Sequence, residues 1–179
     1  MGPNSSAPFA QRWRSVAVVG PLKEAREHEV PIPELTPHGV LPSGRHSCTL
    51  SEIQARYTGN AHRSSLWSAF CRFLKWTNNQ PKPSAIIIDG GFTSDKDKPK
   101  DIDFVFDLTG RDQICQNHWA FVFLKKRKFL MDSFMVDFWV YFPGAPNDLR
   151  SFFEYVKLEE AISRGMQPGD RKGVLVVTP

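Results

Sequence analysis

The sequence predicts an α/β or α+β protein in which helices pack on one side of a small mixed β-sheet. Three observations lead to this fold class. Short apolar runs rich in β-branched or aromatic residues recur at 85–89, 101–108 and 133–142. A segment with helical periodicity precedes them at 66–74, and another follows them at 147–165. The chain shows no internal repeat.

The composition is that of a globular protein, with 41% hydrophobic and 23% charged residues, and 179 residues are most simply one domain. The net charge of +4 suits a polyanionic partner without requiring one. The three cysteines, Cys48, Cys71 and Cys115, are widely spaced and odd in number, which favours a reducing cytoplasm. No apolar run reaches about 18 residues and no signal-peptide pattern opens the chain, so no membrane association is expected.

Residues 1–30 are predicted to form a flexible tail, and residues 31–179 a single domain. The tail opens with small polar residues and continues with the charged stretch "KEAREHE", which has no apolar stripe. Its start fits the bare myristoylation pattern, but Pro3 suits that motif poorly. The next stretch, "VPIPELTPHGVLPSGRH", contains prolines and glycines that require extended or turning backbone.

Two helices are expected next. Thr49 stands three residues before Glu52, a capping box that begins a short helix through Tyr57. A longer helix follows, and "NNQPKP" ends it. Arg63 and Arg72 lie off its apolar face, which is formed by residues at i, i+4, i+7 and i+8: Leu66, Phe70, Phe73 and Leu74.

The remaining elements are mainly strands. The runs "AIIID" (85–89), "DIDFVFDL" (101–108) and "SFMVDFWVYF" (133–142) are predicted strands, and "GVLVV" (173–177) is a candidate last strand. Residues 111–128 fit either one helix or a helix running into an apolar strand. A closing helix is expected over "NDLRSFFEYVKLEEAISRG", capped by Asn147 or Asp148 and ended by Gly165.

Two aspartates open the run at 101–108. In a strand, residues two apart project from the same face, so Asp101 and Asp103 are predicted to point together. Adjacent carboxylates repel each other unless a cation lies between them. Hard oxygen donors of this kind suit Mg²⁺ or Mn²⁺, with phosphate oxygens and water completing the shell. Asp107 shares the face but lies about 13 Å along the strand, too far to bind the same ion.

Gly90 and Gly91 end the preceding apolar run. Without side chains they allow backbone N–H groups to approach an anion closely and allow the chain a sharp exit from the strand. A nucleoside triphosphate on this backbone, with its metal on the two aspartates, makes one coherent site. Lys96, Lys98 and Lys100 are candidate phosphate-binding residues in the loop between, although such a loop is equally expected to be simply solvated.

Other ligand-binding patterns fit less well. A calcium loop needs a central glycine and a glutamate at its twelfth position, where Phe106 stands. Neither GxGxxG nor the Walker-A pattern is present. The basic run 125–128 fits the dipole at the end of a helix, with tracking of a nucleic-acid backbone as the alternative.

The glycines and acids together resemble the signature of the nucleotidyltransferase superfamily that includes DNA polymerase beta. That signature is a strand ending in GG or GS, a short loop, and then two aspartates flanking one hydrophobic residue. Here it is Gly90-Gly91, nine residues, and Asp101-Ile102-Asp103. From about residue 30 onward the chain is also similar to a small bacterial family of uncharacterised nucleotidyltransferase-like proteins, through "IPELTPHGVLPSGRH", "DGGF", "PKDIDF", "DFWVYFP" and "GDRKGVLVV".

The resemblance implies a third acid on a neighbouring strand. Asp137, a lone acid in an apolar strand, is the favoured candidate and Asp132 its competitor. Asp101, Asp103 and Asp137 would then be the catalytic, metal-binding residues, with Asp137 nearest the attacking oxygen. An edge-strand aspartate that simply faces water is the structural alternative.

The implied reaction is Mg²⁺-dependent transfer of a nucleoside monophosphate from a nucleoside triphosphate to a hydroxyl of a protein or RNA acceptor. By analogy the protein would belong to a toxin–antitoxin or defence pair. Two departures, GG where GS is commoner and no arginine-rich element after the glycines, leave a second function open: a non-catalytic protein that binds a nucleotide or partner. A third, a small nucleic-acid-binding protein, would need an exposed aromatic strand face.

Overall fold

The computed structural model describes residues 32–179, so the predicted tail at 1–30 lies outside the described residues. The described chain is α+β. Its five-stranded mixed sheet has the order β1-β5-β2-β3-β4. β1 pairs with β5, and β3 with β4, in parallel, while β2 is antiparallel to both of its neighbours. The strands are β1 (Gly44–Ser47), β2 (Ala85–Asp89), β3 (Ile102–Asp107), β4 (Val136–Tyr141) and β5 (Gly173–Val177).

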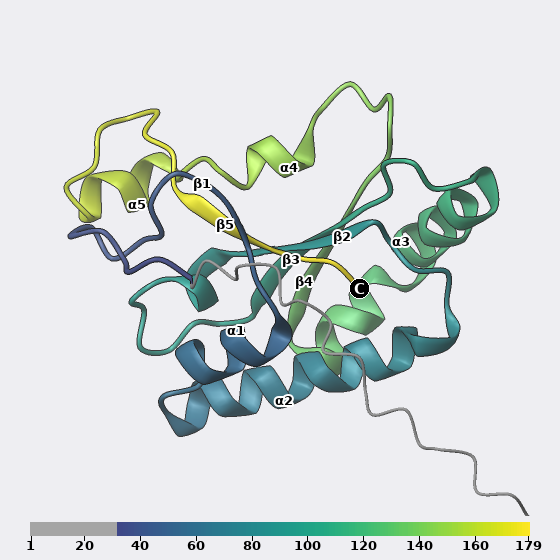
Figure 1. Ribbon diagram of the computed structural model, residues 1–179, viewed down its shortest axis with the longest axis horizontal. Coiled ribbons are helices and arrows are strands. Elements are labelled where there is room, and N and C mark those ends of the chain that lie inside the picture. Colours follow the sequence, from purple (N-terminus) through teal and green to yellow (C-terminus); the bar gives the residue numbers. More distant parts are fainter. Residues whose placement is uncertain (1–31) are drawn as a thin grey trace, which may run out of the picture.

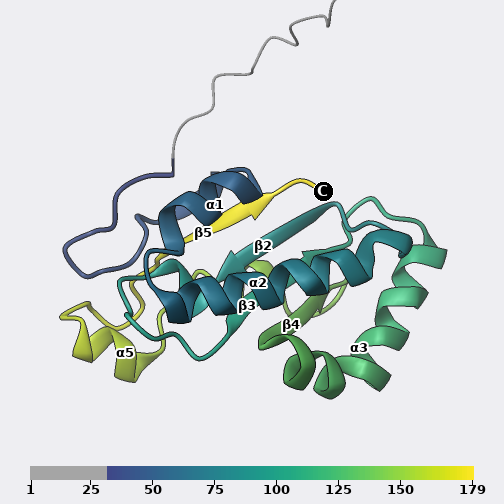
Figure 2. The same ribbon diagram turned by 90° about the horizontal axis from the view of Figure 1, so that it is seen from below.

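Helices lie on both faces of this sheet, whereas one face was predicted. The long helices α2 and α3 and the short α1 cover one face, and α4 lies over the other (Figures 1 and 2). The α-helices are α1 (Leu50–Tyr57), α2 (Ala61–Trp76), α3 (Gln113–Phe134), α4 (Leu149–Phe152) and α5 (Leu158–Ser163), and two 3₁₀ turns are η1 (Thr77–Asn79) and η2 (Gly90–Thr93). No helix of the described residues is long and apolar enough to cross a membrane.

Strand alternation divides the core into two unequal parts. On the α1–α3 face, Phe104 and Phe138 pack in an aromatic cluster with Phe70 and Phe73 of α2. On the other face a smaller cluster joins Ile87, Val105 and Val174 to Phe153, just after α4. Because this smaller cluster covers only part of its face of the sheet, the strand ends beside it can line a cleft.

The predicted short helices and strands agree with the structure. The capping box forms as expected: the Thr49 hydroxyl accepts from the Glu52 amide, and the Glu52 carboxylate accepts from the Thr49 amide at 2.7 Å. The ambiguous segment 111–128 is one helix, α3, capped by Asp112 and ended by Met135 in the left-handed region (φ 51°). The basic run 125–128 thus lies inside a helix that continues to Phe134, and its interpretation as a helix end is wrong.

The prediction of a single closing helix over 147–165 is also wrong. Asp148 caps α4 as one of the two expected candidates, and Gly165 follows α5, but the segment between them is not helical. Tyr155 forms an isolated antiparallel bridge with Arg171, and Val156 is buried beside Val40 and Met166. These long-range contacts require the backbone to leave the helix after Phe153.

Candidate active site

Three aspartates form a row across β2, β3 and the edge strand β4, near the ends of these strands. In the strand registers Asp89 of β2 is opposite Asp103 of β3, and Asp103 is opposite Asp137 of β4. Residues paired across neighbouring strands project from the same face, here the α4 face. Asp101 directly precedes β3, so the loop delivers a fourth carboxylate to the same place.

The row forms the floor of a cleft of about 1180 Å³ between the sheet and the α4–α5 segment. Both glycines line it, as do Lys96 and Lys100. The prediction that Asp101, Asp103, Gly90 and Gly91 lie together, with Asp137 beside them, agrees with this geometry. Lys98 is exposed and does not line the cleft, and Asp132 is an exposed residue of α3 paired with Lys128 at 2.9 Å. Those two residues are therefore set aside as site residues.

The carboxylates perturb one another strongly. The pKa of Asp103 is raised to about 7, first by burial and then by the charges of Asp101, Asp89 and Asp137, against the opposing effect of Lys172. Burial and then the charge of Asp137 raise the pKa of Asp101 as well. A cation placed here would relieve this repulsion.

Two members of the row already have cationic partners that the sequence did not reveal. Lys172, just before β5, binds both carboxylate oxygens of Asp89, and the pair is largely buried. Arg127 of α3 donates to Asp137 at 2.5 Å and to the Phe138 carbonyl at 2.9 Å. Within residues 32–179, the carboxylates of Asp101 and Asp103 receive neither an ion pair nor a hydrogen bond. Asp101 and Asp103, the predicted pair, therefore carry the negative charge that no ion pair within these residues compensates.

Asp89 could have been found from its position directly before the two glycines, at the end of a strand. Arg127 and Lys172 carried no such signal. Each reaches the row only because α3 crosses β4 and β5 is inserted beside β2.

The glycine turn is shaped around Asp103. Gly90 has φ +81°, and a Cβ atom built there would lie 1.7 Å from Oδ2 of Asp103. Only glycine can bring the backbone so close to this carboxylate. Gly91 has no positive φ, and a Cβ atom there would meet the flexible Lys96 side chain at 3.1 Å. The two glycines therefore have different roles, with Gly90 required by the fold and Gly91 facing the cleft.

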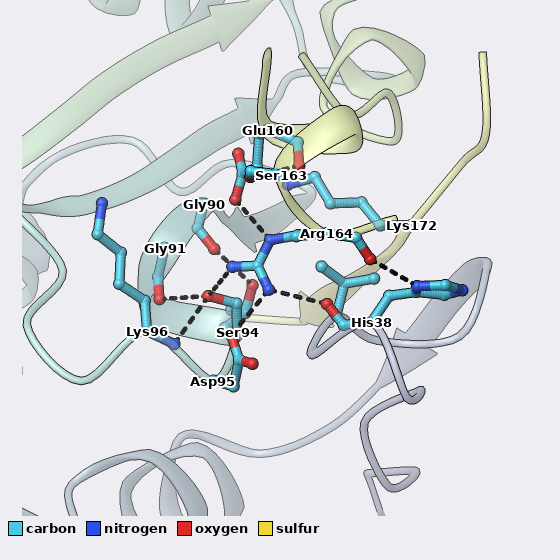
Figure 3. A network of polar contacts seen from close by, with 12 residues as sticks. His38, Gly90, Gly91, Ser94, Asp95, Lys96, Glu160, Ser163, Arg164 and Lys172 are labelled. Carbon is cyan, nitrogen blue, oxygen red and sulfur yellow. Dashed lines mark hydrogen bonds and ion pairs between the residues drawn. The ribbon is translucent and has the colours of Figure 1, made fainter. Parts of the chain in front are cut away.

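The loop after the glycines is held from two sides. Arg63 was predicted to lie off the apolar face of its helix, yet its guanidinium is buried and donates to the carbonyls of Tyr57, Phe92 and Lys96. From α5, Arg164 donates to Asp95 and Glu160 and to the His38 carbonyl (Figure 3). The sequence shows no arginine-rich element directly after the glycines, but Arg164, near the C-terminal end of the chain, lies beside this loop.

The carboxylate oxygens of this site are suitable ligands for a divalent cation, but they do not by themselves form a complete ligand shell. No group of three or more His, Cys, Asp or Glu side chains in the described part of the chain surrounds a metal position. Strands are about 4.8 Å apart, so one ion can bridge neighbouring members of the row but not Asp89 and Asp137 together, which are about 10 Å apart. Asp101 and Asp103, with one oxygen of Asp137 still unpaired, are the oxygen donors available for Mg²⁺ or Mn²⁺.

The fold and the site thus define an α+β protein whose mixed sheet carries a row of carboxylates in a cleft closed by a glycine turn. The chain belongs to a family of unknown function (DUF6932), whose model matches residues 33–178. No curated protein and no solved structure matches it.

Proposed function

We propose that this protein is a Mg²⁺- or Mn²⁺-dependent nucleotidyltransferase that moves a nucleoside monophosphate from a nucleoside triphosphate to a hydroxyl of a protein or RNA acceptor. The observation that carries the proposal is the unpaired Asp101–Asp103 carboxylate pair against the Gly90–Gly91 turn in one cleft. A pair of uncompensated carboxylates next to a glycine backbone that lines the same cleft suits a metal–triphosphate complex better than either ligand alone.

In this proposal Asp101, Asp103 and Asp137 hold the metal, which supplies charge neutralisation and orientation when bound. The Gly91 backbone with Lys96 and Lys100 receives the phosphates. Asp137 accepts the proton of the acceptor hydroxyl. The acceptor oxygen then forms a bond to the α-phosphorus, the bond from that phosphorus to the bridging oxygen breaks, and pyrophosphate leaves.

Transfer of label tests the proposal. Incubation with α-labelled nucleoside triphosphate, Mg²⁺ or Mn²⁺ and a lysate of the native host is expected to label one protein or RNA species. Asp101→Asn and Asp103→Asn should each lower the rate by roughly a hundredfold or more, because each removes a metal-binding oxygen. Equal labelling by the wild type and the double variant would refute nucleotidyl transfer by this site.

Asp132→Asn is the matched control for these variants. Asp107, on the strand face of Asp103, is unsuitable, because its carboxylate accepts from the Thr109 amide at 2.8 Å and pairs with Arg150. Asp132 is exposed and does not line the cleft, and its ion-pair partner among residues 32–179 is Lys128. Its neutralisation should leave both labelling and stability unchanged.

A non-catalytic nucleotide- or partner-binding protein is the second candidate, favoured by one observation. Lys172 and Arg127 already compensate the charges of Asp89 and Asp137, so less of the negative charge of the row remains to bind metal than four free carboxylates would supply. Metal-dependent stabilisation by nucleotide without any transfer of label would establish this function instead. Membership of a toxin–antitoxin or defence pair and a cytoplasmic location stay predictions of the sequence.

A further inference from the structure

A buried ion pair between Lys172 and Asp89 lies at one end of the carboxylate row, and the proposed function does not use it. Both side chains line the cleft, and they are 12% and 6% exposed. Burial raises the pKa of the Asp89 carboxyl even though Lys172 lies against it, so the pair is costly to keep out of water. A costly charge pair in a cleft is a candidate for function rather than for stability.

Lys172 differs from the other lysines of the cleft in being fixed. It donates to both carboxylate oxygens of Asp89, whereas Lys96, Lys100 and Lys157 form no ion pair within residues 32–179. A cation that is already held in place needs no reorganisation when charge develops beside it, which is the property of groups that stabilise transition states. An ammonium group has three N–H donors, so one remains after Asp89 has accepted two.

The place of this pair in the row sets its relation to the reaction. Asp89 is opposite Asp103, Asp103 is opposite Asp137, and the Asp89 end continues directly into the glycine turn. In the proposed function the turn receives the phosphates and Asp137 receives the acceptor hydroxyl. The attacking and leaving oxygens are in line at the phosphorus. A hydroxyl that attacks from the Asp137 end therefore expels pyrophosphate toward the Asp89 end, where Lys172 lies.

We propose that Lys172 is a catalytic residue that stabilises the departing pyrophosphate, an inference that rests on the proposed nucleotidyl transfer. As the bond from the α-phosphorus to the bridging oxygen breaks, its electron pair stays on that oxygen, and the remaining N–H of the Lys172 ammonium donates a hydrogen bond to it. The proton stays on Lys172. Asp89 is a positioning residue, because it fixes the ammonium without taking part in the bond changes.

The dependence of the rate on the leaving group tests this role. Two nucleoside triphosphate analogues, in which CH₂ or CF₂ replaces the oxygen between the β- and γ-phosphorus, keep the α-phosphorus unchanged but expel a poorer or a better leaving group. The double variant with Asp89→Asn and Lys172→Gln replaces the ion pair by two neutral amides of similar size, so no buried charge loses its partner. In single-turnover transfer this variant should lose about a hundredfold in rate with the CH₂ analogue and about tenfold or less with the CF₂ analogue. Equal losses with the two analogues would overturn the role of Lys172.

The matched control is Lys128→Gln with Asp132→Asn, because it neutralises a Lys–Asp pair that is exposed and outside the cleft. It should leave the rates with both analogues unchanged. Thermal unfolding checks the fold of each variant. If the cleft pair cannot be neutralised without unfolding, Lys172→Arg, which keeps the buried charge, carries the same comparison, and its smaller loss should again be greater with the CH₂ analogue.

The outcomes separate this inference from the proposed function. A wild type that transfers no label from the natural triphosphate would refute both together. Transfer by the wild type, with equal losses for the two analogues in the variant, would refute only the role of Lys172.

Discussion

Asp103 occupies the central position of the carboxylate row, which makes it the residue most sensitive to its neighbours. It faces Asp89 on one side and Asp137 on the other, and Asp101 lies two residues before it. Its unpaired, half-buried carboxylate is a source of instability in the metal-free protein. We therefore expect this single residue to dominate the response of the protein to both pH and metal.

Stability should depend on pH through Asp103. Its pKa is raised from 3.8 to about 7 on folding, so its stabilising contribution is full below about pH 4 and is lost as the pH rises through 7. Relative to Asp103→Asn, the metal-free wild type should lose up to about 1.4 kcal/mol per pH unit within that window. Thermal unfolding of both proteins between pH 5 and 8 measures the difference. Parallel pH profiles would contradict it.

Metal binding should restore the stability that ionisation of Asp103 removes at high pH. At pH 8, Mg²⁺ or Mn²⁺ is expected to raise the melting temperature of the wild type, because the ion relieves the repulsion between carboxylates. A nucleoside triphosphate should raise it further only when metal is present. Asp103→Asn should lose the metal effect and Asp132→Asn should keep it. A melting temperature indifferent to both ligands would exclude a metal–nucleotide site here.

At the scale of elements, the glycine turn η2 and the loop after it are held by side chains from other parts of the fold. Gly90 makes the turn possible, Arg63 of α2 binds the carbonyls that follow it, and Arg164 links it to α5. Such a preorganised loop suits a phosphate-binding role, because little backbone ordering remains to be done on binding.

Substitution of the two glycines should separate folding from binding. Gly90→Ala is expected to destabilise the protein by about 2 kcal/mol or more, because alanine is strained at φ +81° and its methyl group would overlap Asp103. Gly91→Val should fold but weaken nucleoside-triphosphate binding, since a Cβ atom there would meet the flexible Lys96 side chain at 3.1 Å and Pro99 at 3.4 Å. Chemical denaturation and nucleotide titration measure the two effects. Unchanged nucleotide binding by a folded Gly91→Val variant would refute the phosphate-binding role of the turn.

Arg63→Lys should destabilise the protein by about 2–3 kcal/mol, because a single ammonium cannot satisfy the three carbonyls, two of them in buried hydrogen bonds, that the guanidinium reaches together. Arg72→Lys on the same helix is exposed and serves as the control, with a change within about 0.5 kcal/mol. Urea denaturation measures both. A similar small loss in the two variants would mean that Arg63 does not hold the loop.

At the scale of the whole molecule, the last strand of the chain, β5, occupies an interior position of the sheet. β5 comes last in the chain, yet it lies between β1 and β2 and brings Lys172 to Asp89. The far end of the chain thus joins the first strand of the described residues to the carboxylate row.

Removal of β5 should therefore abolish cooperative folding. A chain ending at Lys172 lacks this interior strand and its buried Val174, Leu175 and Val177, so β1 and β2 each lose a pairing partner, and no cooperative thermal transition is expected. Removal of only Thr178 and Pro179, which are exposed, is the control and should leave the transition intact. A cooperative transition in the shorter chain would show that β5 is dispensable.

Near neighbours in the sequence decide local features, and these could be predicted. The capping box of Thr49 and Glu52, the apolar strands, and the short spacing that sets Asp101 and Asp103 against the glycines all depend on residues a few positions apart. Only the tertiary structure decided the rest. Burial of Arg63, the inward turn of Arg127, the break after Phe153 and the pairing of Lys172 with Asp89 each depend on a partner outside the local segment. Periodicity within one segment carries no information about such partners, because the partner is chosen by strand order and helix crossing.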